Sequence, residues 1–525
     1  MIPHPPARAS CPILPLGRLA TRRAVLRQRP LLAAALGLLL VALWAAPAWG
    51  WGGSAAPHRA PVAAPGERAA PQPPPPPGPA PAARAEGFVP PGWAALPFAG
   101  MLLSIALVPL AAGRFWERYH SQVALAWAAA GLVVMGASLP AGQGFGAVYG
   151  ARTAATLQDY AGFLILLGTL YIVTGGIHVS GDLRGTPWRN TGMLLLGSVL
   201  ASVIGTTGAA MLLVRPLIRA NARRRSQAHV MVFFIFLVCN IGGALTPIGD
   251  PPLFLGFLEG VPFFWTFKLF PLWTFCVIVL LFAFYAIDET LVRREGLPDE
   301  APGEPVRLHG GVNGVLLLGV IATVVLSGTV HTGVAFRLFG LADVRLEDLL
   351  RNLGQLALAG ISLRVTAREA RRLNGFSYGP LREVGVLFIG IFVTMIPAVM
   401  VLNAQGGALG LSSPATYFWA SGLLSSFLDN APTYLTFLAA AQGQVGAAHA
   451  SALAASEPGE LLLIAVSAGS VFMGANSYIG NGPNFMVKSI AERMGVRMPT
   501  FFGYMGWSCL ILLPLFGLVT LIFLR

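Results

Sequence analysis

The stretch NIGGALTPIGDPPLFL, residues 240–255, decides how the chain folds. Apolar residues precede it in AHVMVFFIFLVC and continue through its last three positions, yet its middle holds three glycines and three prolines. Gly and Pro interrupt helices, so the pattern predicts a membrane helix that is broken in the middle. Unpaired backbone groups cost several kcal/mol each in lipid. Such a break is therefore tolerated only where protein or a water-filled cavity surrounds it, and Asp250 lies inside it.

The composition around this stretch is that of a polytopic membrane protein. The 525 residues are 55% hydrophobic and 11% charged, with a mean hydropathy of +0.68, and apolar windows long enough to cross a bilayer recur. The net charge of +13 comes mainly from arginines in short loops, a pattern typical of membrane topology rather than of nucleic-acid binding. The four cysteines show no metal-binding spacing, and we expect no cofactor.

The N-terminus is expected to lie outside the membrane fold. A basic stretch leads into an apolar core and an Ala-Pro-Ala sequence, so residues 1–48 have the pattern of a signal peptide, or of an N-terminal membrane anchor. Residues 49–91 are rich in Pro and Ala and are predicted to be a disordered tether, because they cannot bury enough apolar surface to fold.

The rest of the chain is predicted to be all-α, with ten spans and two interrupted segments, 191–218 and 412–441. Loops placed on one side hold 20 Lys and Arg residues against five on the other, which puts the first side in the cytoplasm. This topology requires both interrupted segments to be re-entrant hairpins. The spans are expected at 92–112, 121–140, 155–179, 228–261, 263–287, 313–330, 347–366, 383–404, 460–495 and 500–524.

Two pairs of segments reveal an internal repeat. GALTPIGDPPLF (243–254) matches GANSYIGNGPNF (474–485) at six of twelve positions, and SVIGTTGAAML (202–212) lies over SFLDNAPTYLT (426–436). The topology makes these inverted repeats, 92–290 and 313–525, joined by a cytoplasmic linker at 291–312. Inverted repeats with broken helices are the construction of many secondary transporters.

The polar side chains at the hairpin tips and breaks are oxygen donors suited to Na⁺. A carboxyl group at membrane depth is costly when charged, so Asp429 is expected to exchange a proton for Na⁺; Asp250 shares this role or shapes the break. We expect Na⁺ at Asp429, Asn430 and Asn476. The full candidate set for cation or substrate binding is Thr206, Thr207, Asn240, Thr246, Asp250, Asp429, Asn430, Thr433, Asn476, Ser477 and Asn481.

At these residues the chain resembles the NhaD-type sodium/proton antiporters of the ion-transporter superfamily, which also includes arsenite permeases and citrate and dicarboxylate carriers. The likeness covers residues 92–525 and is carried by IGTTGAAMLLVRPLIRAN, NIGGALTPIGDPPLFLGFLEGVPFFWT, FIGIFVTMIPA, SSFLDNAP and GANSYIGNGPNFMVK. The resemblance implies an elevator-like carrier, usually dimeric, with cation sites at Thr206, Thr207, Thr246, Asp250, Asp429, Asn430, Asn476 and Asn481. The superfamily's carboxylate carriers have Ser-Asn-Thr at both tips, where this chain has IGTTG and LDNAPT.

These observations predict a secondary transporter rather than an enzyme, namely a Na⁺(Li⁺)/H⁺ antiporter that spans the inner (plasma) membrane repeatedly as a homodimer. Its partners would be Na⁺ or Li⁺, H⁺ and lipid, and no nucleic acid. An arsenite or carboxylate carrier on the same fold is the alternative. A membrane enzyme such as an intramembrane aspartyl protease is a remote one, since the paired GxGD and Tyr-Asp motifs of those proteases are missing.

Overall fold

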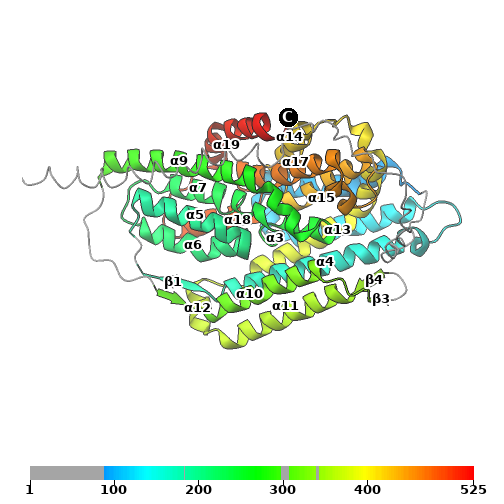
Figure 1. Ribbon diagram of the computed structural model, residues 1–525, viewed down its shortest axis with the longest axis horizontal. Coiled ribbons are helices and arrows are strands. Elements are labelled where there is room, and N and C mark those ends of the chain that lie inside the picture. The colour runs from blue at the N-terminus through cyan, green and yellow to red at the C-terminus, as the bar shows by residue number, and fades with distance from the viewer. Residues whose placement is uncertain (1–87, 182–183, 297–306, 339–341) are drawn as a thin grey trace, which may run out of the picture. The chain divides into compact units, whose positions relative to one another are not determined.

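The computed structural model describes residues 88–525, apart from 182–183, 297–306 and 339–341. The expected signal peptide and almost all of the tether lie outside the described residues, as does the middle of the linker. Where it is described, the chain is mostly helical, as expected (Figure 1).

Nine helical segments in the described part are long and apolar enough to cross a membrane, so the chain is a multi-pass membrane protein. The remaining expected span, 347–366, forms helix α11 (Leu346–Val365), but Glu347, Asp348 and Arg351 make it more polar than the nine. The nine segments are Gly92–Pro109, Gly113–Ala137, Gly146–Thr174, Ala228–Leu245, Phe263–Glu295, Val312–Thr329, Gly379–Leu409, Glu457–Asn476 and Phe501–Phe523.

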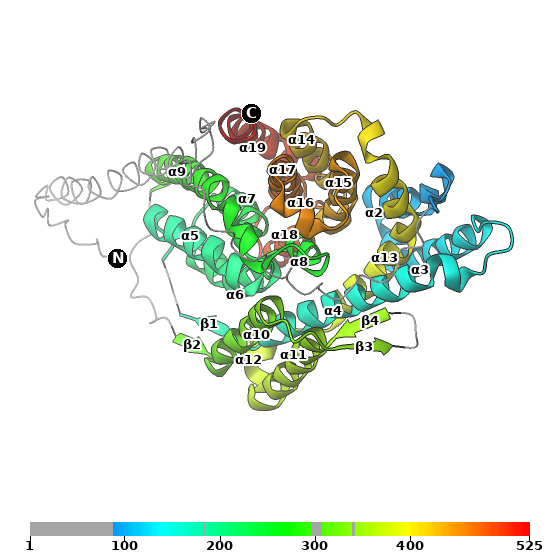
Figure 2. The ribbon, with the colours of Figure 1, turned by 45° about the vertical axis from the view of Figure 1, so that its right-hand side comes forward.

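Long helices form a framework beside the two breaks. Helix α4 packs against α11 and α13, and α13 packs in turn against α3 and α15 (Asn430–Val445) (Figure 2). Helices α2 and α10 complete this framework by packing against α3 and α11, respectively. The framework helices are α2 (Leu96–Ala111), α3 (Gly113–Ala137), α4 (Ala151–Thr174), α10 (Val312–Thr329), α11 and α13 (Gly379–Gln405).

The first half of the chain then forms a helix pair, a broken helix and a long helix. Thr186 caps α5 by accepting a hydrogen bond from the backbone N–H of Arg189, with Pro187 at the first helical position. The pair turns at Gly205, whose φ of +82° is a conformation that favours glycine. The elements are α5 (Pro187–Ile204), α6 (Thr206–Ala220), α7 (Ala228–Leu237), η4 (Ile241–Leu245), α8 (Pro251–Leu258), η5 (Phe263–Leu269) and α9 (Phe270–Glu295).

The second half repeats this order of elements. Ser413 opens its helix pair with a capping box to Thr416, and Asp429 caps the second helix of the pair. The elements are α14 (Pro414–Ser425), α15 (Asn430–Val445), α16 (Ala450–Ala455), α17 (Glu457–Met473), η7 (Gly474–Asn476), α18 (Gly482–Arg493) and α19 (Phe501–Phe523).

Two short antiparallel strand pairs, which the sequence did not predict, join segments outside these helices. Strand β1 (His178–Ser180) pairs with β2 (Arg307–His309), and β3 (Ala335–Leu338) pairs with β4 (Ala342–Arg345). The remaining short helical turns are η2 (Gly92–Ala95), η3 (Gly146–Gly150), α12 (Arg368–Leu373) and η6 (Gly406–Leu409). The pairing of β1 with β2 attaches the end of the linker to the segment that follows α4.

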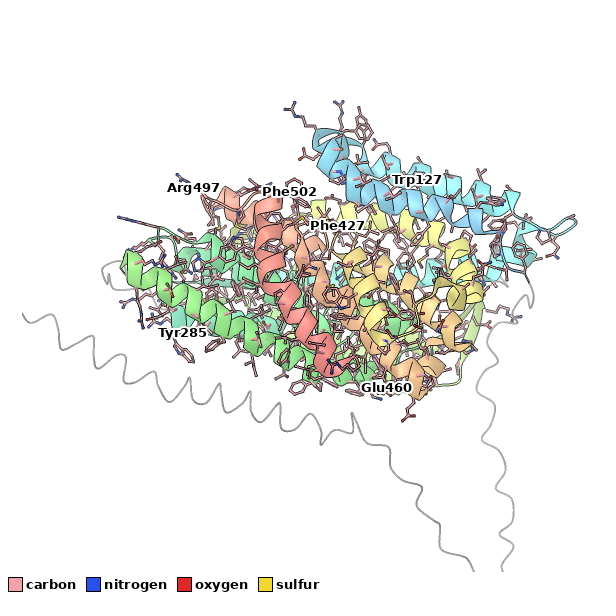
Figure 3. All side chains as sticks on the ribbon, turned by 90° about the horizontal axis from the view of Figure 1, so that it is seen from above. Trp127, Tyr285, Phe427, Glu460, Arg497 and Phe502 are labelled. Atoms are coloured by element: carbon pink, nitrogen blue, oxygen red, sulfur yellow. The ribbon has the colours of Figure 1, made fainter. Side chains whose placement is uncertain are left out.

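The helices that lead into the breaks are the most deeply buried spans. Within an apolar 18-residue window of each segment, 89% of the residues are buried in Ala228–Leu245 and 83% in Glu457–Asn476, whereas 22% are buried in Gly113–Ala137. The outer helices expose apolar side chains on the surface of the molecule, as Figure 3 shows for Phe502 on α19, which is 80% exposed. The broken backbone is therefore enclosed by protein and kept away from lipid.

Candidate functional site

Each break is closed by two glycine backbones in direct contact. A Cβ atom on Gly249 would lie 2.1 Å from the carbonyl oxygen of Gly243, and one on Gly480 would lie 2.6 Å from that of Gly474. These distances exclude any side chain at either position. Glycine is therefore required where the chain reverses, which explains why the aligned stretches share it.

A serine in the first helix pair holds the first break. The Oγ of Ser202 donates to the carbonyl oxygen of Gly242 at 2.5 Å, and it accepts from the backbone N–H of Leu245 at 3.3 Å. In return, Thr246 Oγ1 donates to the carbonyl oxygen of Ser202 at 2.5 Å. Carbonyl and N–H groups that the break leaves unpaired are thus satisfied within the protein.

The second half makes equivalent bonds with equivalent residues. Ser426 Oγ donates to the carbonyl oxygen of Met473 at 3.2 Å, and Ser477 Oγ donates to the carbonyl oxygen of Ser426. Ser426 stands opposite Ser202 in the repeat alignment, and Ser477 stands opposite Thr246. Ser202 was missed as a site residue, although the aligned stretches both begin with this shared serine.

Residues from both halves meet at the carboxylate of Asp250, which is 1% exposed. Its Oδ1 accepts from Thr206 Oγ1 at 2.9 Å and from Asn481 Nδ2 at 3.2 Å. Its Oδ2 accepts from Asn430 Nδ2. Three donors stabilise a charged carboxylate far better than a solvent-free apolar pocket would. We call Thr206, Asp250, Asn430 and Asn481 the Asp250 cluster.

Four helices begin at this cluster. Thr206 and Asn430 are the first residues of α6 and α15, and Asp250 and Asn481 directly precede α8 and α18. Helix α6 packs against α18 and α15 packs against α8, so the two halves interlock here. Helix N-termini carry partial positive charge, which favours an anionic group at the point where they converge.

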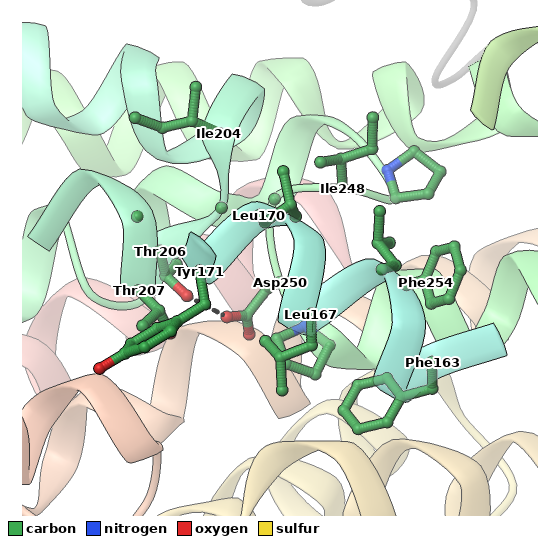
Figure 4. Close-up of a pocket in the computed structure, with 16 residues that line it drawn as sticks. Phe163, Leu167, Leu170, Tyr171, Ile204, Thr206, Thr207, Ile248, Asp250 and Phe254 are labelled. Atoms are coloured by element: carbon green, nitrogen blue, oxygen red, sulfur yellow. Dashed lines mark hydrogen bonds between the residues drawn. The ribbon is translucent and has the colours of Figure 1, made fainter. Parts of the chain in front are cut away.

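A small cavity of about 40 Å³ lies beside the cluster. Thr206, Thr207 and Asp250 line one part of it, and apolar residues of α4 such as Leu167 and Leu170 line another (Figure 4). A water molecule needs roughly 10–15 Å³ on this measure, so the cavity is large enough for a few waters or for a small cation with part of its hydration shell. It is far smaller than the ~300–1,000 Å³ typical of organic ligand pockets.

Three buried amide oxygens in this region accept no hydrogen bond from any described residue: the Oδ1 atoms of Asn240, Asn430 and Asn476. Buried polar atoms almost always have a partner, so each of these oxygens has free capacity to accept one. The oxygen of Asn430 belongs to the same side chain that donates to Asp250. A carboxylate with a free amide oxygen beside it is a donor set that suits a hard cation.

Asn240 joins the two breaks directly. Its Nδ2 donates to Oδ1 of Asn484 at 2.8 Å, and Asn484 Nδ2 donates to the carbonyl oxygens of Gly474 and Ser477. Asn476 instead donates to Ser426 Oγ at 2.9 Å. Two predicted residues, Asn240 and Asn476, therefore hold the breaks in place and make no direct hydrogen bond to Asp250.

The three residues predicted to hold Na⁺ have different hydrogen-bond partners. Asn430 contacts Asp250 and Asn476 contacts Ser426, whereas the half-buried Asp429 accepts from the N–H of Ala431 at 3.1 Å and caps its own helix. Thr433 donates to the carbonyl oxygen of Asp429 at 3.0 Å. Direct hydrogen bonds thus gather polar groups around Asp250, whereas the hydrogen bonds of Asp429 are made with the first turn of α15.

A family model described as "Putative citrate transport" matches residues 89–524. The chain belongs to this family. No curated protein matches the chain. Membership in the citrate-transport family makes the chain a membrane transporter and not an enzyme, which confirms that part of the prediction. It also agrees with the resemblance to the ion-transporter superfamily, while naming citrate transport and not sodium/proton antiport.

Proposed function

We propose that the protein is a secondary active transporter of the inner (plasma) membrane that exchanges Na⁺ or Li⁺ for protons at Asp250. The observation that carries the proposal is the meeting of both halves at one buried carboxylate, with a free amide oxygen of Asn430 beside it. A buried carboxylate is costly unless it is paired or protonated. Na⁺ and H⁺ therefore compete for it, and competition for one site is the minimal chemistry of exchange.

Within this proposal, the two halves are inverted repeats and the pairs α5–α6 and α14–α15 are re-entrant hairpins. The matched bonds of Ser202 with Thr246 and of Ser426 with Ser477 support this, since unrelated segments have no reason to share them. The asymmetry of basic residues supports opposite orientations. Movement of the interlocked helices against α4 and α13 would expose the cluster to each side in turn.

Citrate or another carboxylate is the second candidate substrate, favoured by the family match. Four helix N-termini at one point suit an anion. Two features weigh against it in this conformation: the cavity measures about 40 Å³, and the carboxylate of Asp250 would repel a second one. A bound cation would have to neutralise Asp250 first, so this candidate also makes Asp250 a cation site.

The experiment that separates the candidates uses inside-out vesicles from a host without its own sodium antiporters. A pH-sensitive dye reports the proton gradient while Na⁺, Li⁺, K⁺, citrate or arsenite is added. The variants are Asp250→Asn and Asp429→Asn, with Asp343→Asn as the control, because Asp343 lies on an exposed strand and pairs only with Arg337 among the described residues.

We expect Na⁺ or Li⁺ to dissipate the gradient with the wild type and the control, but not with Asp250→Asn. The antiporter proposal fails if neither cation does so while labelled citrate or arsenite accumulates. If Asp429→Asn abolishes exchange and Asp250→Asn retains it, the exchanging group is Asp429, as the sequence alone predicted. The homodimer remains a prediction, to be checked by measuring the mass of the purified protein in detergent.

A further inference from the structure

A second, much larger cavity of about 770 Å³ lies at the other end of α8. Helices α4, α13 and α15 line most of it, together with residues 446–449. Its wall contains two carboxyl groups, Asp159 on α4 and Glu259 at the C-terminal end of α8. Under the topology above, this chamber lies in the half of the membrane that faces away from the cytoplasm.

The two carboxyl groups of the chamber lack direct partners. No side-chain hydrogen bond or ion pair within the described part of the chain joins Asp159 or Glu259 to another residue, although the two interact electrostatically with each other. Arg152, which also lines the chamber, attracts Glu259 electrostatically. Arg351 and Arg345 also attract Asp159 electrostatically. Both already form salt bridges with the carboxylate of Asp348, each with an N···O distance of 2.9 Å.

A neutral side chain completes the donor set. Gln442 on α15 lines the chamber, is 9% exposed, and its side chain makes no hydrogen bond to any described residue. Because this amide faces the cavity and has no protein partner, its oxygen is free to accept a hydrogen bond or to bind a cation. Like charges that line one cavity destabilise each other, so a cation between Asp159 and Glu259 would relieve their repulsion.

The chamber also lies in line with the Asp250 cluster. Asp250 and Glu259 occupy the two ends of α8, which at eight residues spans about 12 Å. Helix α4 lines both cavities, the chamber from Ala151 to Asp159 and the smaller cavity from Phe163 to Tyr171. One helix pair therefore forms a wall that leads from the chamber to the cluster.

We propose that the chamber is an entry site for a monovalent metal cation, bound by the carboxylates of Asp159 and Glu259 and the amide oxygen of Gln442, on its way to Asp250. This inference rests on the cation transport proposed above. It adds a second cation site, on the path rather than at the point of exchange, and it gives α8 a cation ligand at each end.

The test measures access to the chamber and does not depend on transport. Thr156, which lines the chamber, is replaced by Cys in a background of Cys11→Ser and Cys509→Ser; the remaining cysteines, Cys239 and Cys276, are buried. A cationic and an anionic methanethiosulfonate reagent are applied at low salt, and their rates are normalised to a free thiol. The same measurements are made with Asp250→Asn added, so that failure of the exchange site leaves this test intact.

We expect the cationic reagent to react at least ~10-fold faster than the anionic one, because clefts with charge of one sign concentrate counter-ions. Na⁺ should slow the cationic reaction. Asp159→Asn with Glu259→Gln should bring the two rates together and remove the Na⁺ effect, whereas Asp159→Glu should retain both. Glu460→Gln is the remote control, since Glu460 pairs with Lys268 outside the chamber.

Equal rates for the two reagents, a rate ratio that neutralisation leaves unchanged, or a thiol that no reagent reaches would each overturn the entry site. If the double variant fails to elute as a folded protein in detergent, Asp159→Asn alone is used, with half of the charge effect expected. If the wild type shows the expected labelling pattern but no Na⁺/H⁺ exchange in vesicles, the proposed function is overturned and the chamber remains a cation site.

Discussion

Asn481 occupies the position in the second break that Asp250 occupies in the first, and its Nδ2 donates to Oδ1 of Asp250 at 3.2 Å. The same Nδ2 also donates to the carbonyl oxygen of Cys239, at 3.0 Å. Equivalent residues of the two halves are therefore direct partners at the centre of the molecule. One half contributes the charge and the other a neutral donor, so an otherwise matched arrangement has a single carboxylate at its centre.

The first prediction concerns the neutral partners of Asp250. Asn481→Ala and Asn430→Ala each remove a hydrogen bond to a charged group, worth about 1.5–3 kcal/mol. We expect the Na⁺ concentration for half-maximal exchange to change by roughly 10-fold or more, while the folded protein is retained. Dye measurements over a range of Na⁺ concentrations check this, with Gln143→Ala as an exposed amide control that lines neither cavity. Unchanged Na⁺ dependence in both variants would remove these residues from the site.

The second prediction concerns the glycine contacts that close the breaks. Gly249→Ala and Gly480→Ala force a Cβ against a backbone oxygen, at 2.1 Å and 2.6 Å. Such overpacking costs about 1–3 kcal/mol or more, so thermal unfolding in detergent should occur at lower temperature. Gly482→Ala is the matched control, because no atom lies within 4 Å of its added Cβ. Equal unfolding temperatures for all three variants would contradict the close approach.

A third prediction concerns Asp288 in α9, which is fully buried and lies away from the breaks. It pairs with Arg224 and accepts from His229 Nε2 at 2.7 Å and from Asn190 Nδ2 at 3.0 Å. Removal of one partner from a buried pair costs about 3–5 kcal/mol, so Asp288→Ala should lower stability strongly.

The matched control for Asp288 lies on the same helix. Glu289 and Arg293 form an exposed pair four residues apart, and such pairs contribute about 0–1 kcal/mol. Glu289→Ala should therefore leave the unfolding temperature almost unchanged. If the two substitutions have similar effects, the buried network does not stabilise the fold.

The fourth prediction concerns orientation in the membrane. Arg223, in the Arg-rich loop after α6, should face the cytoplasm, and Gln143, before α4, should face the other side. Both residues are exposed. With the Cys background described above, a membrane-impermeant thiol reagent should label Arg223→Cys only in inside-out vesicles and Gln143→Cys only in right-side-out vesicles. Labelling of both in the same vesicles would refute the topology.

The sequence carried most of the helices and the positions of both breaks, because Gly and Pro have local conformational effects that can be read residue by residue. The sequence did not show which aspartate accepts hydrogen bonds from both halves of the chain. Asp429 stands in the more apolar run, which made it the stronger candidate, but it directly precedes α15 and caps that helix. Which carboxylate faces the other half depends on how α6 packs on α18 and α15 on α8, and single-sequence patterns contain no such long-range information.

Two other features had weak signals or none. The pairing of β1 with β2 involves two three-residue strands that are 127 to 131 positions apart in the chain, too short for a recognisable alternation. Ser202 had a usable signal, since it aligns with Ser426. A serine in a membrane helix is a weak signal by itself, because such serines often bond to their own helix, as Ser198 does here with the carbonyl oxygen of Leu194.

The partners of Asp250 are synthesised well after it, and this affects how the chain folds during translation. Asn430 follows it by 180 residues and Asn481 by 231. At roughly 5–20 residues per second, a ribosome needs about 10–50 s after Asp250 to produce the second asparagine. During that interval the nascent first half holds a carboxylate at membrane depth without two of its three donors. Completion of the fold must therefore await the end of translation, and a chain truncated before Asn481 is expected to be a substrate for membrane quality control.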